Sequence, residues 1–338
     1  MKTAAETLAF FNSALAAMPL DRKPEGLYAP VKYVLSLGGK RIRPVLMLMA
    51  YELFREDIES ALPTALGIET YHNYTLLHDD VMDKADMRRG KPTVHRVWNE
   101  NTAILSGDAM LVLAYQLMGQ AKAEHLKAVL DLFTETALEI GEGQQYDMDF
   151  ETRMDVKEEE YIEMIRLKTS VLLACALKLG AIQADAPAAD ADHLYRFGEN
   201  LGLAFQLQDD LLDVYGDPAT FGKNIGGDIL EGKKTFMLIN ALQLANPEQR
   251  EALERWLATP VDADGIGASG CCPKGQSATE KIAAVTALYN QIGVRQLAEQ
   301  RITAYFEEAF KDLDAVALPA ERKQPLRDLA LSLMGRKH

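Results

Sequence analysis

Apolar residues recur at intervals of three and four along most of the chain. This spacing places apolar side chains on one face of an α-helix. It is found in residues 8–18, 45–54, 66–81, 104–118, 126–140, 161–179, 194–214, 236–244 and 282–310. Runs that alternate apolar and polar positions, as half-buried strands do, are nearly absent. The pattern therefore predicts an all-α fold of helices joined by short connections.

Glycine and proline cluster where the helical pattern breaks, for example at residues 37–39, 90–92 and 215–218. Residues 259–279 form a long stretch of loop composition, which predicts a surface insertion in a single domain spanning residues 1–338. Cys271 and Cys272 lie in this stretch, but no second Cys or His pair near them would complete a metal site. Cys175 is the third cysteine of the chain. Three cysteines are too few for a disulfide framework, which predicts a reducing, cytoplasmic location.

The overall charge changes the expected set of partners. Lys plus Arg number 36 and Asp plus Glu number 50, so the formal net charge is −14. An acidic protein is poorly suited to general binding of nucleic acid or of an anionic membrane. The N-terminus lacks a continuous hydrophobic leader, and Asp108 and Gln116 interrupt the most membrane-like stretch, so we expect no stable membrane insertion. An anionic ligand would need local basic residues or metal ions.

Two short segments, residues 79–83 and 209–213, repeat the pattern Asp-Asp-x-x-Asp inside strongly apolar helical stretches. Residues four apart lie on one face of a helix, so Asp79 and Asp83 are neighbours on one helix face, as are Asp209 and Asp213. A solvated acidic face is the simplest interpretation of one such cluster. Two clusters of ionised carboxylates within apolar helices are costly unless cations neutralise them, which favours metal binding.

Clustered carboxylates suit Mg²⁺, which takes a few protein oxygens and completes its shell with water and phosphate oxygens. Two clusters that face one another could hold three Mg²⁺ ions and a diphosphate. A calcium-binding EF-hand is the competing interpretation, but the sequence has no Asp-x-Asp-x-Asp-Gly loop. We therefore expect a magnesium and diphosphate site.

Basic residues occur where such a site would need them. Each alone would be an ordinary exposed cation, but together they suggest that diphosphate binds at two places, one through metal and one directly. They are Lys40, Arg41 and Arg43 at a turn entering a helix, Arg88 and Arg89 after the first acidic cluster, and Lys223, Lys233 and Lys234 after the second.

Around these residues the sequence closely resembles the trans-isoprenyl diphosphate synthases, the polyprenyl synthetase family. The resemblance implies a single-domain bundle of antiparallel helices around a central cavity, usually a homodimer. It also implies head-to-tail prenyl transfer between isopentenyl diphosphate and an allylic diphosphate. The matching segments, in order, are GGKRIRP, LLHDDVMDKADMRRGKPTVH, GDAML, GEGQQYDMD, KTS, FQLQDDLLDVYGD, FGKNIGGDI and EGKKTF.

The resemblance also implies roles for individual residues. Asp79 and Asp83, supported by Asp80, would bind two Mg²⁺ ions, and Asp209, with Asp210 and Asp213, would bind the third. The allylic diphosphate would be held by these ions and by Arg88, Lys168 and Lys233. Thr169, Gln206 and Lys223 match positions that line the allylic site, and Gln144 with Asp147 matches a motif beside it. The diphosphate of isopentenyl diphosphate would be held by Lys40, Arg43, His72 and Arg89.

His72 lies seven residues before Asp79, two helical turns along the same face, which favours a role in the same cleft over a purely structural one. The basic C-terminal residues 335–338 fit either a lid over the site or a frayed terminus.

Product length should depend on residues upstream of Asp79. Tyr74 lies five positions before it, about 7 Å along the helix axis. In the family a bulky aromatic residue there tends to stop chain growth early, and Thr75 is small where some 15-carbon synthases have a second aromatic. These features predict a short product, geranylgeranyl diphosphate ahead of farnesyl diphosphate. Core packing is the alternative role for Tyr74.

Two other functions stay open at this point. A terpene cyclase shares the ionisation chemistry, but its second metal motif normally contains Asn or Asp, then Ser or Thr, then Glu, where this chain has residues 209–213. A non-catalytic subunit of a heteromeric synthase typically loses one or both aspartate clusters, and here both are intact.

Overall fold

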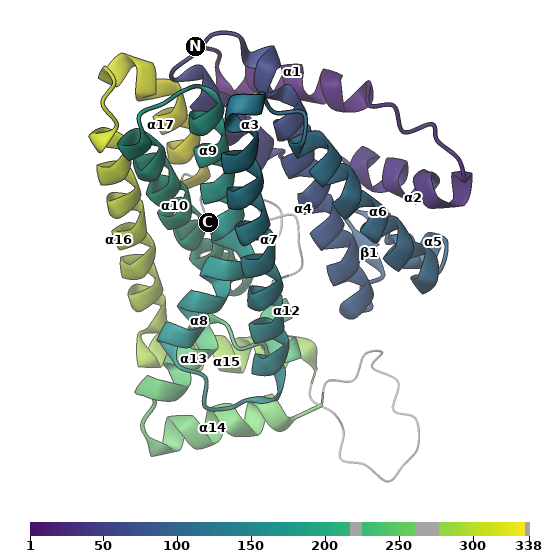
Figure 1. The fold of residues 1–338 in the computed structure, drawn as a ribbon. Helices are drawn as coiled ribbons and strands as arrows, with labels where there is room; N and C mark the ends of the chain where they lie inside the picture. Colours follow the sequence, from purple (N-terminus) through teal and green to yellow (C-terminus); the bar gives the residue numbers. More distant parts are fainter. Residues whose placement is uncertain (217–224, 261–276, 335–338) are drawn as a thin grey trace. The chain divides into compact units, whose positions relative to one another are not determined.

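The structure is a computed structural model that describes residues 1–216, 225–260 and 277–334. Contacts divide it into two compact units. Unit 1 comprises residues 1–137, 172–198 and 311–330, and unit 2 comprises the described residues within 138–171, 199–310 and 331–338. The predicted all-α fold is confirmed, because nearly all regular structure is helical (Figure 1). The single-domain organisation stays a prediction.

The helices have the following bounds. In the first half of the chain they are α1 (Ala4–Ala16), α2 (Glu25–Ser36), α3 (Ile42–Glu52), η1 (Ile58–Ala61), α4 (Leu62–Met82), α5 (Val94–Val97), α6 (Glu100–Met118), α7 (Ala123–Thr152) and α8 (Glu158–Ile165). There follow η2 (Arg166–Ser170), α9 (Val171–Gln183), α10 (Ala188–Tyr215), α12 (Gly227–Glu231), α13 (Phe236–Leu244), α14 (Pro247–Ala258), α15 (Ala278–Ile292), α16 (Val294–Ala315) and α17 (Ala320–Met334).

Helices with a long apolar repeat were predicted correctly, and those with proline or many charges were not. The sequence pattern missed α2 and α17, which contain Pro30 and Pro325, and the charged α14. The predicted helix over residues 282–310 is in fact two helices, α15 and α16. Gly293 separates them with φ 87°, a left-handed conformation that glycine adopts without strain.

A two-residue hairpin, β1 (Met87–Arg88) with β2 (Lys91–Pro92), is the strand pairing in the described part of the chain. Arg89 and Gly90 form its turn with φ 53° and 74°. Positive φ at both turn residues matches the twist of a tight hairpin. The hairpin therefore reverses the chain directly after α4 and fixes the direction of Arg88 and Arg89.

In unit 1, α4 packs against α3 and α6. Helix α3 is apolar on every side and buried from Pro44 to Glu52, as expected of a helix enclosed by others. On α6, Gly107 allows His78 of α4 to approach, because a Cβ there would lie 2.2 Å from His78 Nε2. The lower part of α4, which carries the first aspartate cluster, is thus held against α6.

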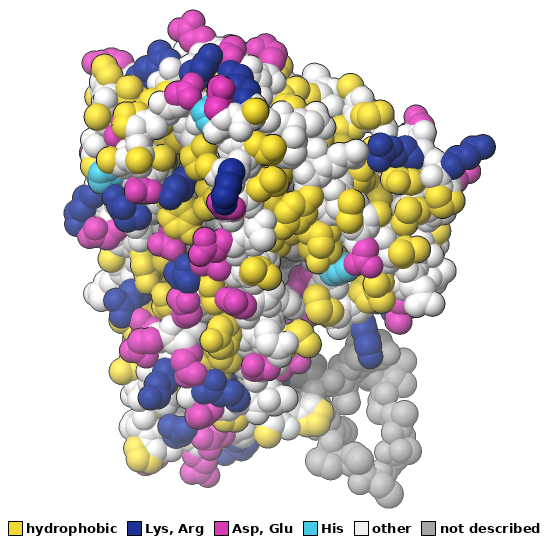
Figure 2. All heavy atoms as spheres, viewed as in Figure 1, with side chains coloured by type: hydrophobic (Ala, Val, Ile, Leu, Met, Phe, Trp, Pro, Cys, Tyr) yellow, Lys and Arg dark blue, Asp and Glu magenta, His cyan; other side chains and the backbone are white. Residues whose placement is uncertain are grey.

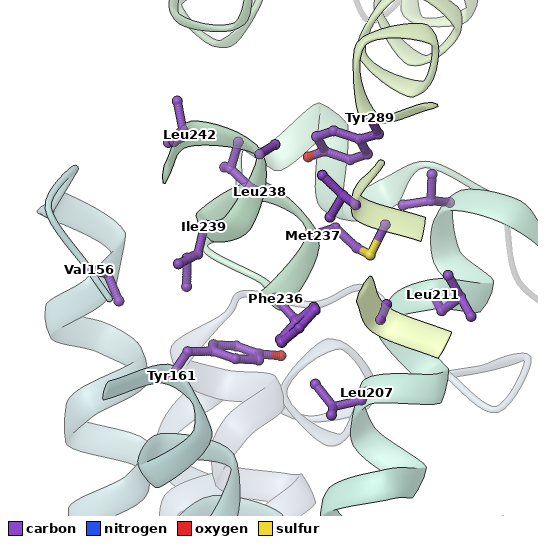
Figure 3. Close-up of a cluster of buried hydrophobic side chains, with 14 of the residues drawn as sticks. Val156, Tyr161, Leu207, Leu211, Phe236, Met237, Leu238, Ile239, Leu242 and Tyr289 are labelled. Atoms are coloured by element: carbon purple, nitrogen blue, oxygen red, sulfur yellow. The ribbon is translucent and has the colours of Figure 1, made fainter. Parts of the chain in front are cut away.

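In unit 2, a core of buried apolar side chains joins α8, α10, α13 and α15 (Figure 3). Tyr161 of α8 points toward Phe236 at the start of α13, and Leu207 and Leu211 of α10 lie beside them. Residues 207 and 211 are four apart and so share one face of α10. This packing fixes the helix that carries the second aspartate cluster.

Among the helices of residues 1–216, 225–260 and 277–334, none is both long and apolar enough to cross a bilayer.

Candidate active site in two parts

The first aspartate cluster lies at the C-terminal end of α4 in unit 1. Asp79 and Asp80 belong to the last helical turn and Asp83 is the C-cap, its backbone N–H donating to the Asp79 carbonyl at 2.9 Å. The C-terminus of a helix carries a partial negative charge, which disfavours anions. Three carboxylates at this position therefore favour the binding of cations.

Asp80 is tied to Arg88 of the hairpin. Arg88 Nε donates to both carboxylate oxygens of Asp80 at 2.8 Å, and Nη2 lies 2.8 Å from Oδ1. Burial raises the pKa of Asp80, and Arg88 opposes this effect. Arg88 Nη2 also lies 3.8 Å from Asp79 Oδ2. Asp80 thus holds the guanidinium of Arg88 beside Asp79.

A second group in unit 1 joins the basic turn to α4. Arg43 Nη1 lies 3.2 Å from His72 Nε2. Burial, opposed by the charge of Glu69 and aided by that of Arg89, lowers the pKa of Arg43 to about 10. The pKa of His72 is also lowered well below its usual value. Burial is the largest cause, and the positive charges of Arg43 and Arg89 add to it. His72 is therefore neutral at neutral pH and lies among guanidinium groups, an arrangement that favours an anion.

A buried ion pair supports this basic group, and sequence reasoning missed it. Glu69 of α4 is 1% exposed and accepts a hydrogen bond from Arg41 at 2.5 Å and one from Asn73 at 2.8 Å. Arg41 also donates to the Leu35 carbonyl at 2.7 Å. Arg41 is itself buried, with 6% exposure, so these contacts make it an anchor of the basic turn. The apolar run around Glu69 was the available signal, since a buried carboxylate needs a partner.

Arg89 lies against the glycine turn that precedes α3. Its Nη1 donates to the Gly38 carbonyl. A Cβ on Gly39, which has φ 128°, would lie 2.8 Å from Arg89 Cζ. Lys40 follows on the same turn and is exposed. Unit 1 therefore brings together the predicted residues Arg43, His72 and Arg89, with Lys40 beside them.

The second aspartate cluster lies in unit 2, near the C-terminal end of α10. Asp210 is buried, with 4% exposure, and accepts hydrogen bonds from the Tyr161 hydroxyl, from Gln206 Nε2 at 3.3 Å and from the Phe236 N–H at 3.4 Å. Burial raises the pKa of Asp210 to about 7, although the Tyr161 hydrogen bond lowers it. Asp210 thereby joins α8, α10 and α13. The role of Tyr161 was not predicted from the sequence.

The two clusters share one arrangement. In each, the second aspartate is buried and bound to a protein donor, while the first and the fifth are less buried. Asp213 accepts one hydrogen bond from the Asp228 N–H at 3.1 Å. Each cluster therefore presents two carboxylates from one helix face, Asp79 with Asp83 and Asp209 with Asp213.

Magnesium fits this donor set only with help from a ligand. Within the described residues, no group of three or more His, Cys, Asp and Glu side chains is placed to hold a metal ion. Mg²⁺ commonly binds through one or two carboxylates, with water and substrate phosphates completing its shell. Two hard oxygen donors for each cluster satisfy that requirement.

Lys168 and Thr169 lie in η2, a π-helical turn between α8 and α9. Such turns often occur at functional sites because they displace side chains from the regular helix. Lys168 Nζ donates to Asp147 Oδ2 at 2.6 Å, and Thr169 Oγ1 donates to Gln206 Oε1 at 3.4 Å. Gly143 of α7 makes room for the turn, since a Cβ there would lie 2.3 Å from the Lys168 backbone nitrogen.

Lys233 follows α12, and its backbone N–H donates to the Asp228 carbonyl at 2.9 Å. Its positive charge lowers the pKa of Asp210. Lys223, the Cys271-Cys272 pair and residues 335–338 lie outside the described residues, as does most of the predicted insertion at 259–279. Unit 2 therefore places Lys168, Thr169, Gln206 and Lys233 around the second cluster's hydrogen-bond network.

Comparison with known proteins identifies the family. The polyprenyl synthetase family model matches residues 24–265, which include both aspartate clusters. The chain belongs to the polyprenyl synthetase family. Among its relatives, a geranylgeranyl diphosphate synthase of Methanosarcina mazei is 36% identical over 88% of this chain and 86% of the relative. A short chain isoprenyl diphosphate synthase of Methanocaldococcus jannaschii is 44% identical over 68% of this chain and 71% of the relative.

Solved structures agree with this assignment. A crystal structure of a geranylgeranyl pyrophosphate synthase aligns with a TM-score of 0.92 and 42% identity, covering 100% of both chains. One from Pyrococcus horikoshii aligns with a TM-score of 0.86 and 30% identity, covering 98% of this chain and 99% of that one. The described residues therefore have the fold of these synthases.

In this member of the polyprenyl synthetase family, the aromatic residue upstream of the first cluster lies in a ring cluster. Tyr74 is 4.8 Å from His78 and 5.5 Å from Tyr71, measured between ring centroids. Tyr71 in turn meets Phe133 edge to face at 5.1 Å. Thr75 Oγ1 donates to the His72 carbonyl at 2.8 Å. Several rings thus surround Tyr74 on α4, where the sequence predicted the control of product length.

Proposed function

We propose that this polyprenyl synthetase is a prenyltransferase that condenses isopentenyl diphosphate with an allylic diphosphate, head to tail, to a short-chain trans-prenyl diphosphate. The reaction would depend on Mg²⁺, with three ions for each active site. The observation that carries the proposal is the arrangement common to both clusters. Two carboxylates of each lie on one helix face and are less buried than the aspartate between them, which binds Arg88 in one cluster and Tyr161 in the other.

We infer that the allylic diphosphate binds to the residues that the family resemblance assigns to it. Asp79, Asp83, Asp209 and Asp213 would hold the Mg²⁺ ions, which when bound neutralise the diphosphate as its carbon–oxygen bond ionises. Arg88, Lys168 and Lys233 would add direct positive charge. Arg88 is preoriented by Asp80, and Lys168 by Asp147 at 2.6 Å, so neither has to be ordered during the reaction.

The diphosphate of isopentenyl diphosphate would bind Lys40, Arg43, His72 and Arg89. Neutral His72 keeps one ring N–H available to donate while it contacts Arg43 at 3.2 Å. The double bond of this substrate attacks the allylic cation, and the new C–C bond leaves a cation that loses a proton. The departing diphosphate would accept that proton, which completes the step.

Product length would be set by the ring cluster around Tyr74. A growing chain that passes along α4 away from Asp79 meets Tyr74 first, with Thr75 leaving space on the neighbouring position. We propose geranylgeranyl diphosphate as the main product, ahead of farnesyl diphosphate. The relatives from Methanosarcina mazei and Geoglobus acetivorans are geranylgeranyl diphosphate synthases, which supports the 20-carbon choice.

We further propose that two copies of the chain associate through α6 and that the protein is cytoplasmic. Large apolar side chains are exposed on this helix, with Leu105 at 60% and Val112 at 68%. Figure 2 shows hydrophobic side chains gathered on the surface over α6. Exposed apolar patches of this kind commonly mark protein interfaces.

A direct assay tests the function. Purified protein is incubated with labelled isopentenyl diphosphate, geranyl diphosphate and Mg²⁺, and the dephosphorylated products are separated by chromatography. A linear 20-carbon alcohol that requires both substrates supports the proposal. A cyclic hydrocarbon from the allylic substrate alone would instead identify a terpene cyclase, and absence of turnover would identify a non-catalytic subunit.

A further inference from the structure

A cavity of about 480 Å³ lies in unit 2, between the segment that precedes α8 and the helices α13 and α14. Small-molecule sites typically have volumes of about 300–1,000 Å³. Of the basic residues that suggested diphosphate binding in the sequence, Lys234 alone lines this cavity, and it is not among those that the family resemblance assigns to either diphosphate. The cavity therefore contains none of the residues assigned to the condensation reaction.

The floor of the cavity is apolar. Leu238, Ile239 and Leu242 come from one face of α13, and Val156 lies across from Ile239 on the segment before α8 (Figure 3). These four side chains are buried, with exposures of 2% to 8%. Met154, also part of the lining, is 51% exposed. A flexible thioether beside a buried apolar floor can cover a bound alkyl chain.

Lys234 supplies a positive charge at the side of this floor. It is half-buried, and its Nζ donates to the Glu151 and Gly232 carbonyls, both at 3.3 Å. In the described part of the chain its ammonium has no carboxylate within ion-pair distance. An ammonium has three N–H donors, so one remains for a ligand. Burial lowers the pKa of Lys234, and the charge of Glu151 opposes this effect without an ion-pair contact. Because a partly buried charge without a contacting counter-ion is costly, a bound anion would be stabilised here.

The other charged groups of the lining leave a positive balance. Asp155 accepts a hydrogen bond from Arg153 at 2.9 Å, and Arg250 pairs with Glu254 at 3.0 Å, so partners outside the lining neutralise both. The remaining charged side chains of the lining are two cations, Lys157 and Lys234, and one anion, the exposed Glu159. The cavity thus combines an apolar floor with a half-buried cation, Lys234, whose charge the more distant Glu151 offsets in part.

We propose that this cavity binds an amphipathic anion, a short alkyl chain with a single carboxylate or phosphate head. The chain lies over Leu238, Ile239 and Leu242, and the head accepts a hydrogen bond from Lys234. Binding is independent of the proposed condensation, because it uses no residue of the two aspartate clusters or of the basic turn.

The test is an NMR titration with sodium octanoate and with octyl phosphate, using protein labelled at the methionine methyl groups. Met154→Leu assigns the Met154 signal, which reports on the cavity alone. We expect a saturable shift of that signal with both anions. Saturation at lower concentration with octyl phosphate identifies the phosphate as the preferred head. 1-Octanol and octyltrimethylammonium, which have the same chain but no negative charge, should shift it at least tenfold more weakly.

Two matched pairs of variants locate the head and the rim. Lys234→Met should weaken octanoate binding by about tenfold or more, the usual range for a charge-assisted hydrogen bond, and the exposed Lys127→Met should not change it. Gln243→Glu adds a negative charge to the lining without changing the shape and should also weaken binding. Gln120→Glu, on an exposed turn far along the sequence, is its control.

The proposal is overturned if the Met154 signal does not saturate, if 1-octanol binds as tightly as octanoate, or if Lys234→Met binds like the wild type. Condensation assayed without octanoate should be unchanged in Gln243→Glu. If the wild-type protein has no condensation activity, the proposed function fails while the titration still decides the cavity.

Discussion

The hydrogen bond from Tyr161 to Asp210 is the contact in unit 2 whose removal should be most informative. Both residues are buried, at 2% and 4% exposure, so no water can replace the lost hydroxyl easily. In Tyr161→Phe, Asp210 would keep only the two long hydrogen bonds from Gln206 at 3.3 Å and Phe236 at 3.4 Å. The substitution thereby removes the hydrogen bond between α8 and α10, while the aromatic ring still fills its place in the core.

The size of the effect follows from the burial of the acceptor. Leaving a buried polar group without its hydrogen bond costs about 1–3 kcal/mol, so we expect Tyr161→Phe to lower the free energy of unfolding by this amount. Helix α8 leads directly into the π-helical turn with Lys168, and α13 follows Lys233. Loosening this network should also lower kcat and raise the KM for the allylic diphosphate. The KM for isopentenyl diphosphate should not change, because its proposed ligands lie in unit 1.

Urea denaturation and steady-state kinetics measure both effects, and Tyr289→Phe is the matched control. Tyr289 lies in the same core at 2% exposure, but its hydroxyl makes no hydrogen bond to any described residue. Its loss should leave stability and kinetics close to wild type. Equal losses in the two variants, or a wild-type allylic KM in Tyr161→Phe, would refute the positioning role of Tyr161.

Three further predictions follow from particular residues. The pKa of His72 is lowered in the folded state, whereas in the unfolded chain His72 takes up a proton near pH 6.5. The free energy of unfolding should therefore fall as the pH drops below 6.5, by at most about 1.4 kcal/mol per pH unit. Urea midpoints at several pH values measure this slope, which should be smaller in His72→Gln; an equal slope in that variant would exclude His72 as its source. Gly143→Ala should lower kcat at least tenfold, because the new Cβ displaces the backbone of Lys168, whereas Gly141→Ala on the same helix, where a Cβ meets nothing within 4 Å, should retain activity. Kinetics that do not distinguish these two variants would contradict the role of that close approach. Tyr74→Ala should lengthen the product measured by chromatography, and an unchanged chain length would assign Tyr74 to core packing alone.

Periodicity was sufficient to predict the long helices, because each buries one continuous apolar face. It failed at α2, α14 and α17, where proline or charge obscures the repeat and packing with other elements overrides local preference. The π-helical turn at Lys168 was also missed, because the room for it comes from Gly143, far away in the sequence.

The aspartate clusters could be found from the sequence because their i, i+4 spacing is local. The hydrogen-bond partners of the buried aspartate in each cluster could not be predicted. The partners of Asp80 and Asp210 are Arg88 and Tyr161, one supplied by a hairpin and the other by a separate helix. Glu69 and Arg41 form a similar buried pair beneath the basic turn. Such long-range partners depend on tertiary packing, which a hydrophobic repeat does not specify.

The proposed function requires that both clusters bind one diphosphate through shared divalent ions. Electron paramagnetic resonance of Mn²⁺, titrated with an unreactive thiolodiphosphate analogue of the allylic substrate, tests it most directly. The account predicts tight Mn²⁺ binding only when the analogue is present, and loss of that binding in both Asp79→Asn and Asp209→Asn. Mn²⁺ binding that does not require the analogue, or that survives either substitution, would contradict it.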